Sequence, residues 1–210
     1  MEDSQRLSYI YGSVDAAKKA SHKYIAALNN FPKRVNWTKV SYRMGQALES
    51  YVGDCDVFIF ISENPNYTYF DTCISGQATV PDKINPERDL EIHVDISSDL
   101  FNNTIPITKE YEDYFQHMFV LTFIHELTHS TQYDDMIEQK LTGSKKERYL
   151  ASPFELDAYS TECAYEMHQN GGKRTTTEAY LRYNSVRDRK VFRKFRDMTL
   201  EKYRYLKDYK

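Results

Sequence analysis

The chain has 210 residues, 40% of them hydrophobic, which is enough for one compact domain with a sizeable core. With only 7 Gly and 6 Pro, the composition excludes a collagenous or low-complexity chain. The net charge of −3 argues against a molecule that binds nucleic acid over its whole surface. That charge is uneven, because residues 182–210 carry 11 Lys and Arg against 4 Asp and Glu. A basic C-terminal segment therefore follows an acidic body.

The first half of the chain predicts two helices followed by three strands. Apolar residues recur at helical spacing over 13–29 and over 37–51. Short runs of β-branched and aromatic residues predict strands over 55–62, 67–75 and 90–97. The last run, LEIHVDIS, alternates apolar and polar residues, so we expect a half-buried strand at a sheet edge.

The second half predicts only helices. One begins at the N-cap Thr108 and runs to about 133. Another covers 152–168, where Ser152, Pro153 and Glu155 give a start signal and a capping box. A long basic helix closes the chain from about 176 to 208. These elements predict an α+β fold in a single domain, residues 1–210, with 176–210 as a basic C-terminal helix.

Features of targeting and of redox chemistry point to the cytoplasm. The N-terminus has no basic region followed by an apolar run, as a signal peptide would. No apolar stretch approaches the ~18 residues of a membrane span. Cys55, Cys73 and Cys163 are odd in number and lack metal-site spacing, which is typical of free thiols in a reducing compartment.

The stretch LTFIHELTHSTQ, residues 121–132, contains the pattern HExxH. Residues four apart lie one turn apart on the same face of a helix, so His125 and His129 can direct two imidazoles at one metal ion. Glu126 lies about 100° around the helix, close enough to a metal-bound water to take its proton. The pattern predicts a zinc site, and the alternative is a hydrogen-bonded histidine pair on a buried helix.

A catalytic zinc needs a third protein ligand, and the segment SPFELDAYSTE supplies candidates. Glu155 is the first choice, with Tyr159 and Glu162 on the same helical face as support. Asp157 lies on another side of that helix and remains open either as the ligand or as the group that orients a ligating histidine. The competing interpretation makes Glu155 a capping residue only.

The HExxH pattern followed by a helix with Glu155 resembles the gluzincin branch of zinc metallopeptidases. The spacing HELTH…FELDAY is similar to ImmA/IrrE-like peptidases and to small phage and bacterial metallopeptidases, over residues 90–168. The resemblance implies a zincin-like fold, in which a small mixed sheet has an edge strand packed on the active-site helix. It also implies zinc bound by His125, His129 and Glu155, with Glu126 as general base. The pattern departs from metzincins, because no third His follows at their spacing.

The same resemblance implies that an edge strand before the active-site helix holds an extended peptide substrate. The segment EIHVDI is in the place for that strand, with His93 either lining the cleft or lying on the surface. An oxyanion donor is also required, and Tyr159 is the expected one, with Tyr165 behind it. The implied reaction is hydrolysis of a peptide bond in a protein or peptide substrate.

The basic C-terminal segment allows two interpretations. Its apolar residues predict a final helix packed on the domain, whereas its charge would also suit nucleic acid or an anionic membrane. Beside the zinc peptidase, two other functions therefore remain: a metal-binding regulator without proteolytic activity, and a nucleic-acid-binding protein whose histidine pair is structural.

Overall fold

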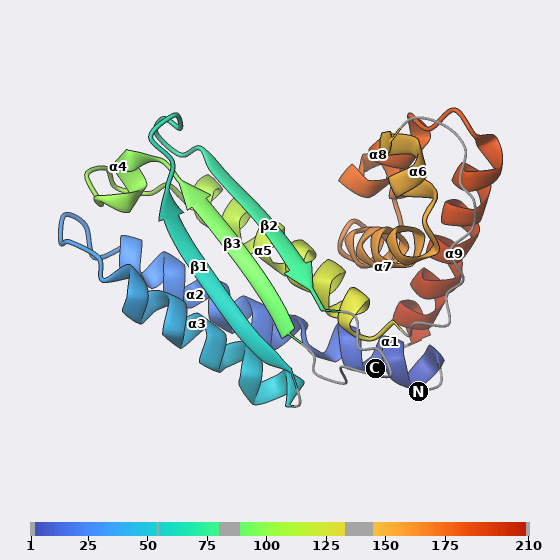
Figure 1. Cartoon of the computed structure of the whole chain (residues 1–210), viewed down its shortest axis with the longest axis horizontal. Helices are drawn as coiled ribbons and strands as arrows, with labels where there is room; N and C mark the ends of the chain where they lie inside the picture. The colour runs from blue at the N-terminus through green and yellow to red at the C-terminus, as the bar shows by residue number, and fades with distance from the viewer. Residues whose placement is uncertain (1–2, 54, 80–88, 133–144, 209–210) are drawn as a thin grey trace. The chain divides into compact units, whose positions relative to one another are not determined.

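A computed structural model describes residues 3–53, 55–79, 89–132 and 145–208. These residues form an α+β structure divided into two compact units (Figure 1). The sheet unit comprises residues 13–53, 55–79 and 89–126, and the helical unit comprises residues 3–12, 127–132 and 145–208.

The sheet unit contains a small mixed sheet of three strands in the order β1-β3-β2. β3 runs parallel to β1 and antiparallel to β2, so β2 is an edge strand of the sheet that the described residues form. The strand bounds are β1 Asp56–Glu63, β2 Thr72–Ala78 and β3 Asp89–Ile96. The expectation that residues 90–97 form an edge is wrong, because β3 pairs with β1 on one side and with β2 on the other. The expected alternation is present: Leu90, Ile92, Val94 and Ile96 are fully buried on one face of the strand.

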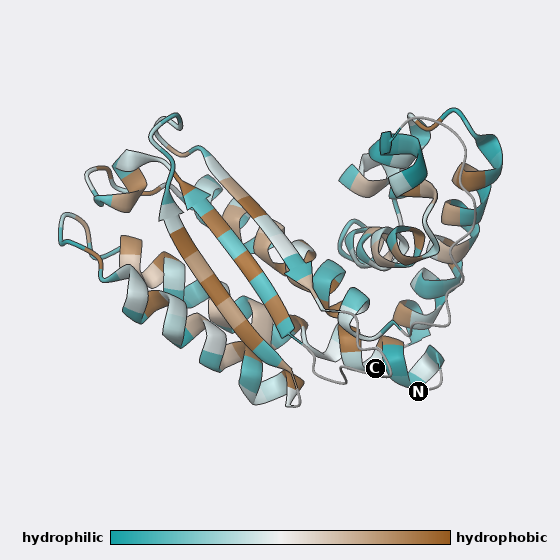
Figure 2. Ribbon diagram, viewed as in Figure 1, coloured by the Kyte–Doolittle hydropathy of each residue, from teal (hydrophilic) through white to brown (hydrophobic). Residues whose placement is uncertain are grey.

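One face of this sheet is covered by helices. In Figure 1 the long helices of the unit lie on one side of the strands, and in Figure 2 β3 is banded by alternating hydropathy. The bounds of the unit's helices are α2 Val14–Leu28, α3 Trp37–Val52, α4 Ser98–Phe101 and α5 Lys109–Ser130. The ring of Tyr24 stacks on Phe115 at 3.8 Å between centroids, which joins α2 to α5 in the core. α5 begins where Thr108 caps the Tyr111 amide, as predicted.

The helical unit contains the last turn of α5 and the remaining helices. Their bounds are α1 Asp3–Gly12, α6 Lys145–Ala151, α7 Pro153–Gln169, the 3-10 turn η1 Arg174–Thr176, α8 Glu178–Asn184 and α9 Arg189–Asp208. The predicted single helix over 176–208 is wrong, because residues 185–188 separate α8 from α9. Stacking of Tyr183 on Phe195, with centroids 4.1 Å apart, packs α8 against α9.

The basic helix α9 is a packed element of this unit. Its buried residues recur at helical spacing and belong to the core against α7: Phe195, Thr199, Lys202 and Leu206. The charges on its other face remain exposed. Within the described residues, no helix combines the length and apolar composition that a membrane span requires.

Candidate metal site

Three side chains with metal-binding atoms converge at the end of α5. One donor atom each from His125, His129 and Glu155 lies within 4.8 Å of the others. α5 continues across the boundary of the two units, so the place of His125 one turn before His129 follows from the helix itself. His125 is buried, and the side chains of His129 and Glu155 are only 13% and 12% exposed. The residue types and their closeness match the ligand set of a zinc ion.

The orientation of the His129 ring is fixed by Gln132. The amide nitrogen of Gln132 donates to the Phe154 carbonyl oxygen at 2.9 Å and to Asp157 Oδ2 at 3.1 Å. Because both partners accept, the amide oxygen must face His129, whose Nδ1 lies 2.8 Å from it. Nδ1 of His129 therefore carries a proton and donates it, which leaves Nε2 as the lone-pair nitrogen of the neutral ring.

That lone pair is aimed at a carboxylate. Nε2 of His129 lies 3.5 Å from Oε1 of Glu155. Two acceptors facing one another repel unless a cation, either a proton or a metal ion, lies between them. The distance fits a metal, since two ligands on a tetrahedral ion with bonds of ~2.1 Å are about 3.4 Å apart.

Asp157 is held in a buried cluster of charge rather than at the metal-binding atoms. Arg6 makes two hydrogen bonds to its carboxylate, at 2.6 and 3.0 Å. The Lys202 ammonium lies 2.5 Å from Asp157 Oδ1 and also donates to its carbonyl oxygen and to the hydroxyls of Ser160 and Thr161. Of the two roles left open for Asp157, the structure places it in the orienting position, where it reaches His129 through Gln132.

The charges in this cluster are set by burial and by pairing. Burial by itself would raise the pKa of Asp157, but Lys202 and Arg6 lower that pKa well below its ordinary value. Burial lowers the pKa of Lys202 to about 8, against the attraction of Asp157. Both groups are therefore charged at neutral pH, and Asp157 is a permanent acceptor for the Gln132 amide.

Glu126 lies against β2 at Gly76. A Cβ atom at position 76 would be 2.3 Å from Cγ of Glu126 and 2.8 Å from its Oε1. Any side chain there would displace the carboxylate, so the glycine is what admits Glu126 beside the edge strand. Glu126 is itself buried, with 7% of its surface exposed.

Two tyrosines close to Glu155 differ in exposure: Tyr159 is buried and Tyr149 is exposed. Tyr159 is buried, its hydroxyl accepts a hydrogen bond from Arg182, and the Arg182 guanidinium lies 4.9 Å from its ring centroid. Tyr149 on α6 is 49% exposed and shares side-chain hydrogen bonds with Glu155 and Tyr159. Burial first, and then the charge of Glu155, raise the pKa of Tyr149, which keeps its hydroxyl protonated as a donor.

The other residues singled out in the sequence lie elsewhere. Glu162 and Tyr165 are buried on α7, outside the group of three donors. His93 is on the central strand, where it stacks on Phe60 at 4.9 Å and contacts Glu91. Ser152 precedes α7 with Pro153 at N1 but makes no side-chain cap hydrogen bond.

Sequence reasoning missed Gln132, Gly76 and Tyr149. Gln132 follows the second histidine by three residues, which is the one signal that could have suggested a local contact with it. Gly76 and Tyr149 carry no such signal, since one of 7 glycines and one of 18 tyrosines cannot be chosen without the pairing of elements. No protein-family model, curated protein or solved structure matches the chain.

Proposed function

We propose that this chain is a zinc-dependent peptidase of zincin-like architecture, with the metal held by His125, His129 and Glu155. The observation that carries the proposal is the His129 ring, whose Nδ1 donates to Gln132 and whose Nε2 faces the Glu155 carboxylate at 3.5 Å. In a metal-ligating histidine one ring nitrogen binds the ion and the other donates to an orienting partner. Here Gln132 would be the orienting partner, and Glu155 would be a second ligand opposite Nε2. A bound zinc ion would lower the pKa of a water molecule and polarise a carbonyl group.

Glu126 is the proposed general base. Its carboxylate takes a proton from the attacking water and passes it to the leaving amine of the substrate. It follows His125 directly on α5, so it sits about 100° around the helix from that ligand and is not one of the converging donors. Gly76 leaves the space in which this carboxylate lies.

The edge strand β2 is the proposed platform for an extended peptide. Among the described residues β2 pairs with β3 alone, and Gly76 in its middle leaves room for Glu126 beside it. An extended chain that adds to a sheet edge gains backbone hydrogen bonds along its whole length. This assigns to β2 the role that the family resemblance gives to the strand before the active-site helix.

Tyr149 is the proposed donor to the oxyanion of the tetrahedral intermediate. Tyr149 is half-exposed and its hydroxyl lies beside Glu155, whereas Tyr159 is buried with Arg182 on its hydroxyl. A donor placed at the developing charge lowers the barrier because it needs no reorganisation during the reaction.

The experiment that tests the proposal measures bound zinc per chain by elemental analysis, together with cleavage of a denatured protein substrate. Wild type and Glu126→Gln are expected to hold about one zinc per chain, and Glu126→Gln is expected to lose cleavage. His129→Ala and Glu155→Ala should lose both. His117→Ala is the matched control, because His117 is an exposed histidine on the same helix.

Two results would contradict the proposal. If folded wild type takes up no zinc after incubation with the metal, the histidine pair is structural. If wild type holds zinc but cleaves no more substrate than Glu126→Gln does, the site is that of a metal-binding regulator.

A further inference from the structure

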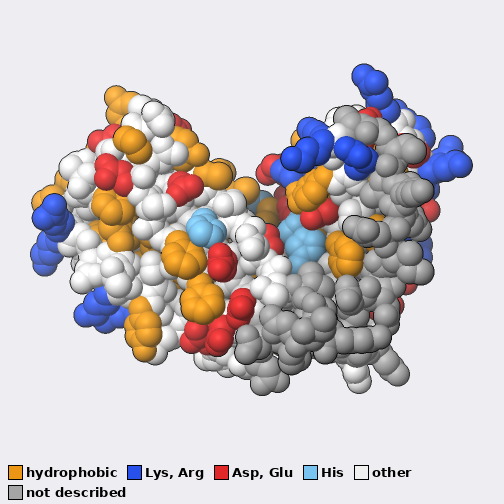
Figure 3. Space-filling model, in the orientation of Figure 1, with side chains coloured by type: hydrophobic (Ala, Val, Ile, Leu, Met, Phe, Trp, Pro, Cys, Tyr) orange, Lys and Arg blue, Asp and Glu red, His pale blue; other side chains and the backbone are white. Residues whose placement is uncertain are grey.

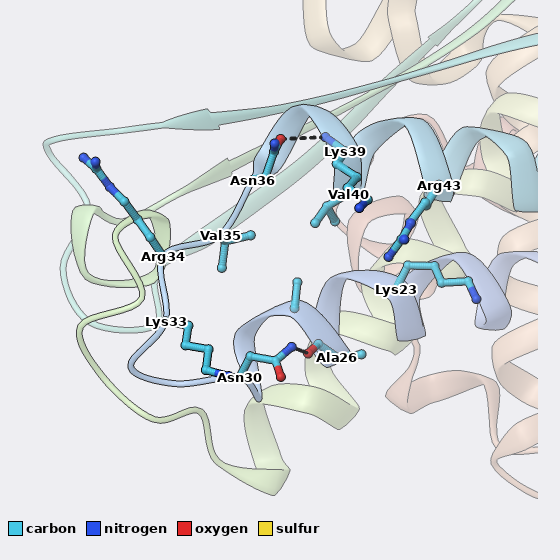
Figure 4. A pocket seen from close by; sticks show the side chains of 11 residues that line it. Lys23, Ala26, Asn30, Lys33, Arg34, Val35, Asn36, Lys39, Val40 and Arg43 are labelled. Carbon is cyan, nitrogen blue, oxygen red and sulfur yellow. Dashed lines mark hydrogen bonds between the residues drawn. The ribbon is translucent and has the colours of Figure 1, made fainter.

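A basic cavity lies in the sheet unit, between the end of α2, the start of α3 and the loop that joins them (Figure 4). Its volume is about 450 Å³. No Asp or Glu is among the lining residues, and five of them are cations: Lys23, Lys33, Arg34, Lys39 and Arg43. Figure 3 shows Lys and Arg side chains gathered over this end of the unit, at the left of the view.

These five cations lack a paired carboxylate among the residues that the structure describes. Within the part of the chain that the structure describes, no ion pair joins any of them to a carboxylate. Other surface cations of the chain do have such partners, as Lys109 has in Glu112 and Asp113. Lys and Arg side chains from α2, α3 and the loop between them raise the positive potential at the cavity, and a bound anion would reduce their mutual repulsion.

The cavity wall is fixed before any ligand arrives. The buried side chain of Asn103 donates to the Lys33 carbonyl oxygen at 2.8 Å, and Trp37 Nε1 donates to the Phe101 carbonyl oxygen at 2.7 Å. Both bonds fasten the loop to the chain after β3. Asn36 caps α3 by accepting from the Lys39 amide at 3.0 Å. Binding to a wall held in this way loses little conformational entropy.

The lining also restricts the class of anion. Ala26, Ala27, Val35 and Val40 give an apolar floor, and no aromatic residue lines the cavity. Single-stranded nucleic acid is held by stacking of its bases on aromatic rings, so this lining does not suit it. The volume is within the range of small-molecule sites, about 300–1,000 Å³.

We propose that this cavity binds a small ligand that carries two or more phosphate groups, either inorganic oligophosphate or the phosphate chain of a nucleotide. Figure 4 shows Arg43 of α3 directed toward Lys23 of α2, so cations from both helices line the cavity, whereas Arg34 is directed away from it. Charge-assisted hydrogen bonds from Lys and Arg to phosphate oxygens are strong. The inference does not depend on the metal site, because none of its residues belongs to that site.

The test is titration calorimetry of the full chain at near-physiological salt with tripolyphosphate, ATP and orthophosphate. We expect saturable binding of about one tripolyphosphate or ATP per chain and much weaker binding of orthophosphate. Tighter binding of ATP than of tripolyphosphate would show that the nucleoside contacts the apolar floor and that the ligand is a nucleotide. Equal or weaker binding of ATP would show that the site recognises the phosphate groups alone.

The double variant Lys39→Gln, Arg43→Gln should weaken this binding by about tenfold or more. The matched control is Arg193→Gln, Lys194→Gln, which removes the same charge from exposed positions of α9 and should leave affinity within about twofold. All four positions are exposed, and unchanged circular dichroism and melting temperature will verify folding. Absence of saturable binding of both oligophosphates to wild type, or equal losses in the two double variants, would overturn the proposal.

Discussion

The amide oxygen of Gln132 lies 2.8 Å from Nδ1 of His129, and the same amide donates to Asp157. This relay makes metal binding sensitive to a residue that is not a ligand. Gln132→Ala should raise the dissociation constant for zinc by about 10- to 100-fold, because the His129 ring loses its fixed tautomer and orientation. Competition with a zinc-binding dye measures the change. Gln116→Ala is the control, since the amide nitrogen of Gln116 lies 2.8 Å from Nε2 of His22, a glutamine–histidine contact away from the site. Equal zinc affinities in wild type and Gln132→Ala would contradict the relay.

Gly76→Ala should separate catalysis from metal binding. The added methyl group would overlap Glu126, which must move, while the three donor atoms stay in place. We expect zinc content near that of wild type, kcat lower by about 10²-fold or more, and a free energy of unfolding lower by about 1–3 kcal/mol. Gln77→Ala, an exposed neighbour on the same strand, is the control. A Gly76→Ala variant with full activity would show that Glu126 needs no such space.

Tyr149→Phe and Tyr159→Phe distinguish the two candidate oxyanion donors. If Tyr149 is the donor, its loss should lower kcat by about 10²-fold with KM and zinc content little changed. Tyr159→Phe should mainly lower stability, because its hydroxyl is the acceptor for Arg182 in the interior. Steady-state kinetics on both variants decides between them, and a larger fall in kcat for Tyr159→Phe would restore the residue that the sequence favoured.

Lys202→Met should be strongly destabilising although Lys202 belongs to a basic helix whose other charged residues are mostly exposed. Its side chain is only 7% exposed, and its ammonium group makes four contacts on α7. Breaking a buried charge network typically lowers the free energy of unfolding by about 3–5 kcal/mol. Urea unfolding followed by circular dichroism measures this, with the exposed Lys207→Met as control. A loss as small as that of the control would contradict the buried placement.

Stability should fall at alkaline pH through a tyrosine in the sheet unit. Burial raises the pKa of Tyr111 from 10.0 to about 12, and its hydroxyl contacts those of Tyr24 and Thr72. A pKa raised on folding gives stability that is fully present below pH 10 and is lost as pH rises through 12, up to about 2–3 kcal/mol. Tyr111→Phe should therefore lose less stability than wild type between these two pH values in urea unfolding. Parallel losses in the two proteins would contradict this assignment.

Local sequence patterns determined most of the elements and part of the site. Apolar periodicity predicted α2 and α3, and the start signals at Thr108 and Ser152 predicted α5 and α7, all close to their observed bounds. The sequence patterns missed α1 and the short helices α4 and α6. His125 and His129 share a face because four residues make about one turn, so their relation needs no tertiary information.

Only the tertiary structure decided how the elements are placed relative to one another within each unit. Strand order is one of them: the alternation in LEIHVDIS is equally compatible with an edge and a centre, and the pairing partners choose the centre. Which carboxylate of α7 faces His129 is another, since Arg6 and Lys202, far away in the sequence, hold Asp157 and leave Glu155 beside the ring. Helical spacing determines the face on which a side chain lies, but the partner of that face is set by packing between segments remote in sequence.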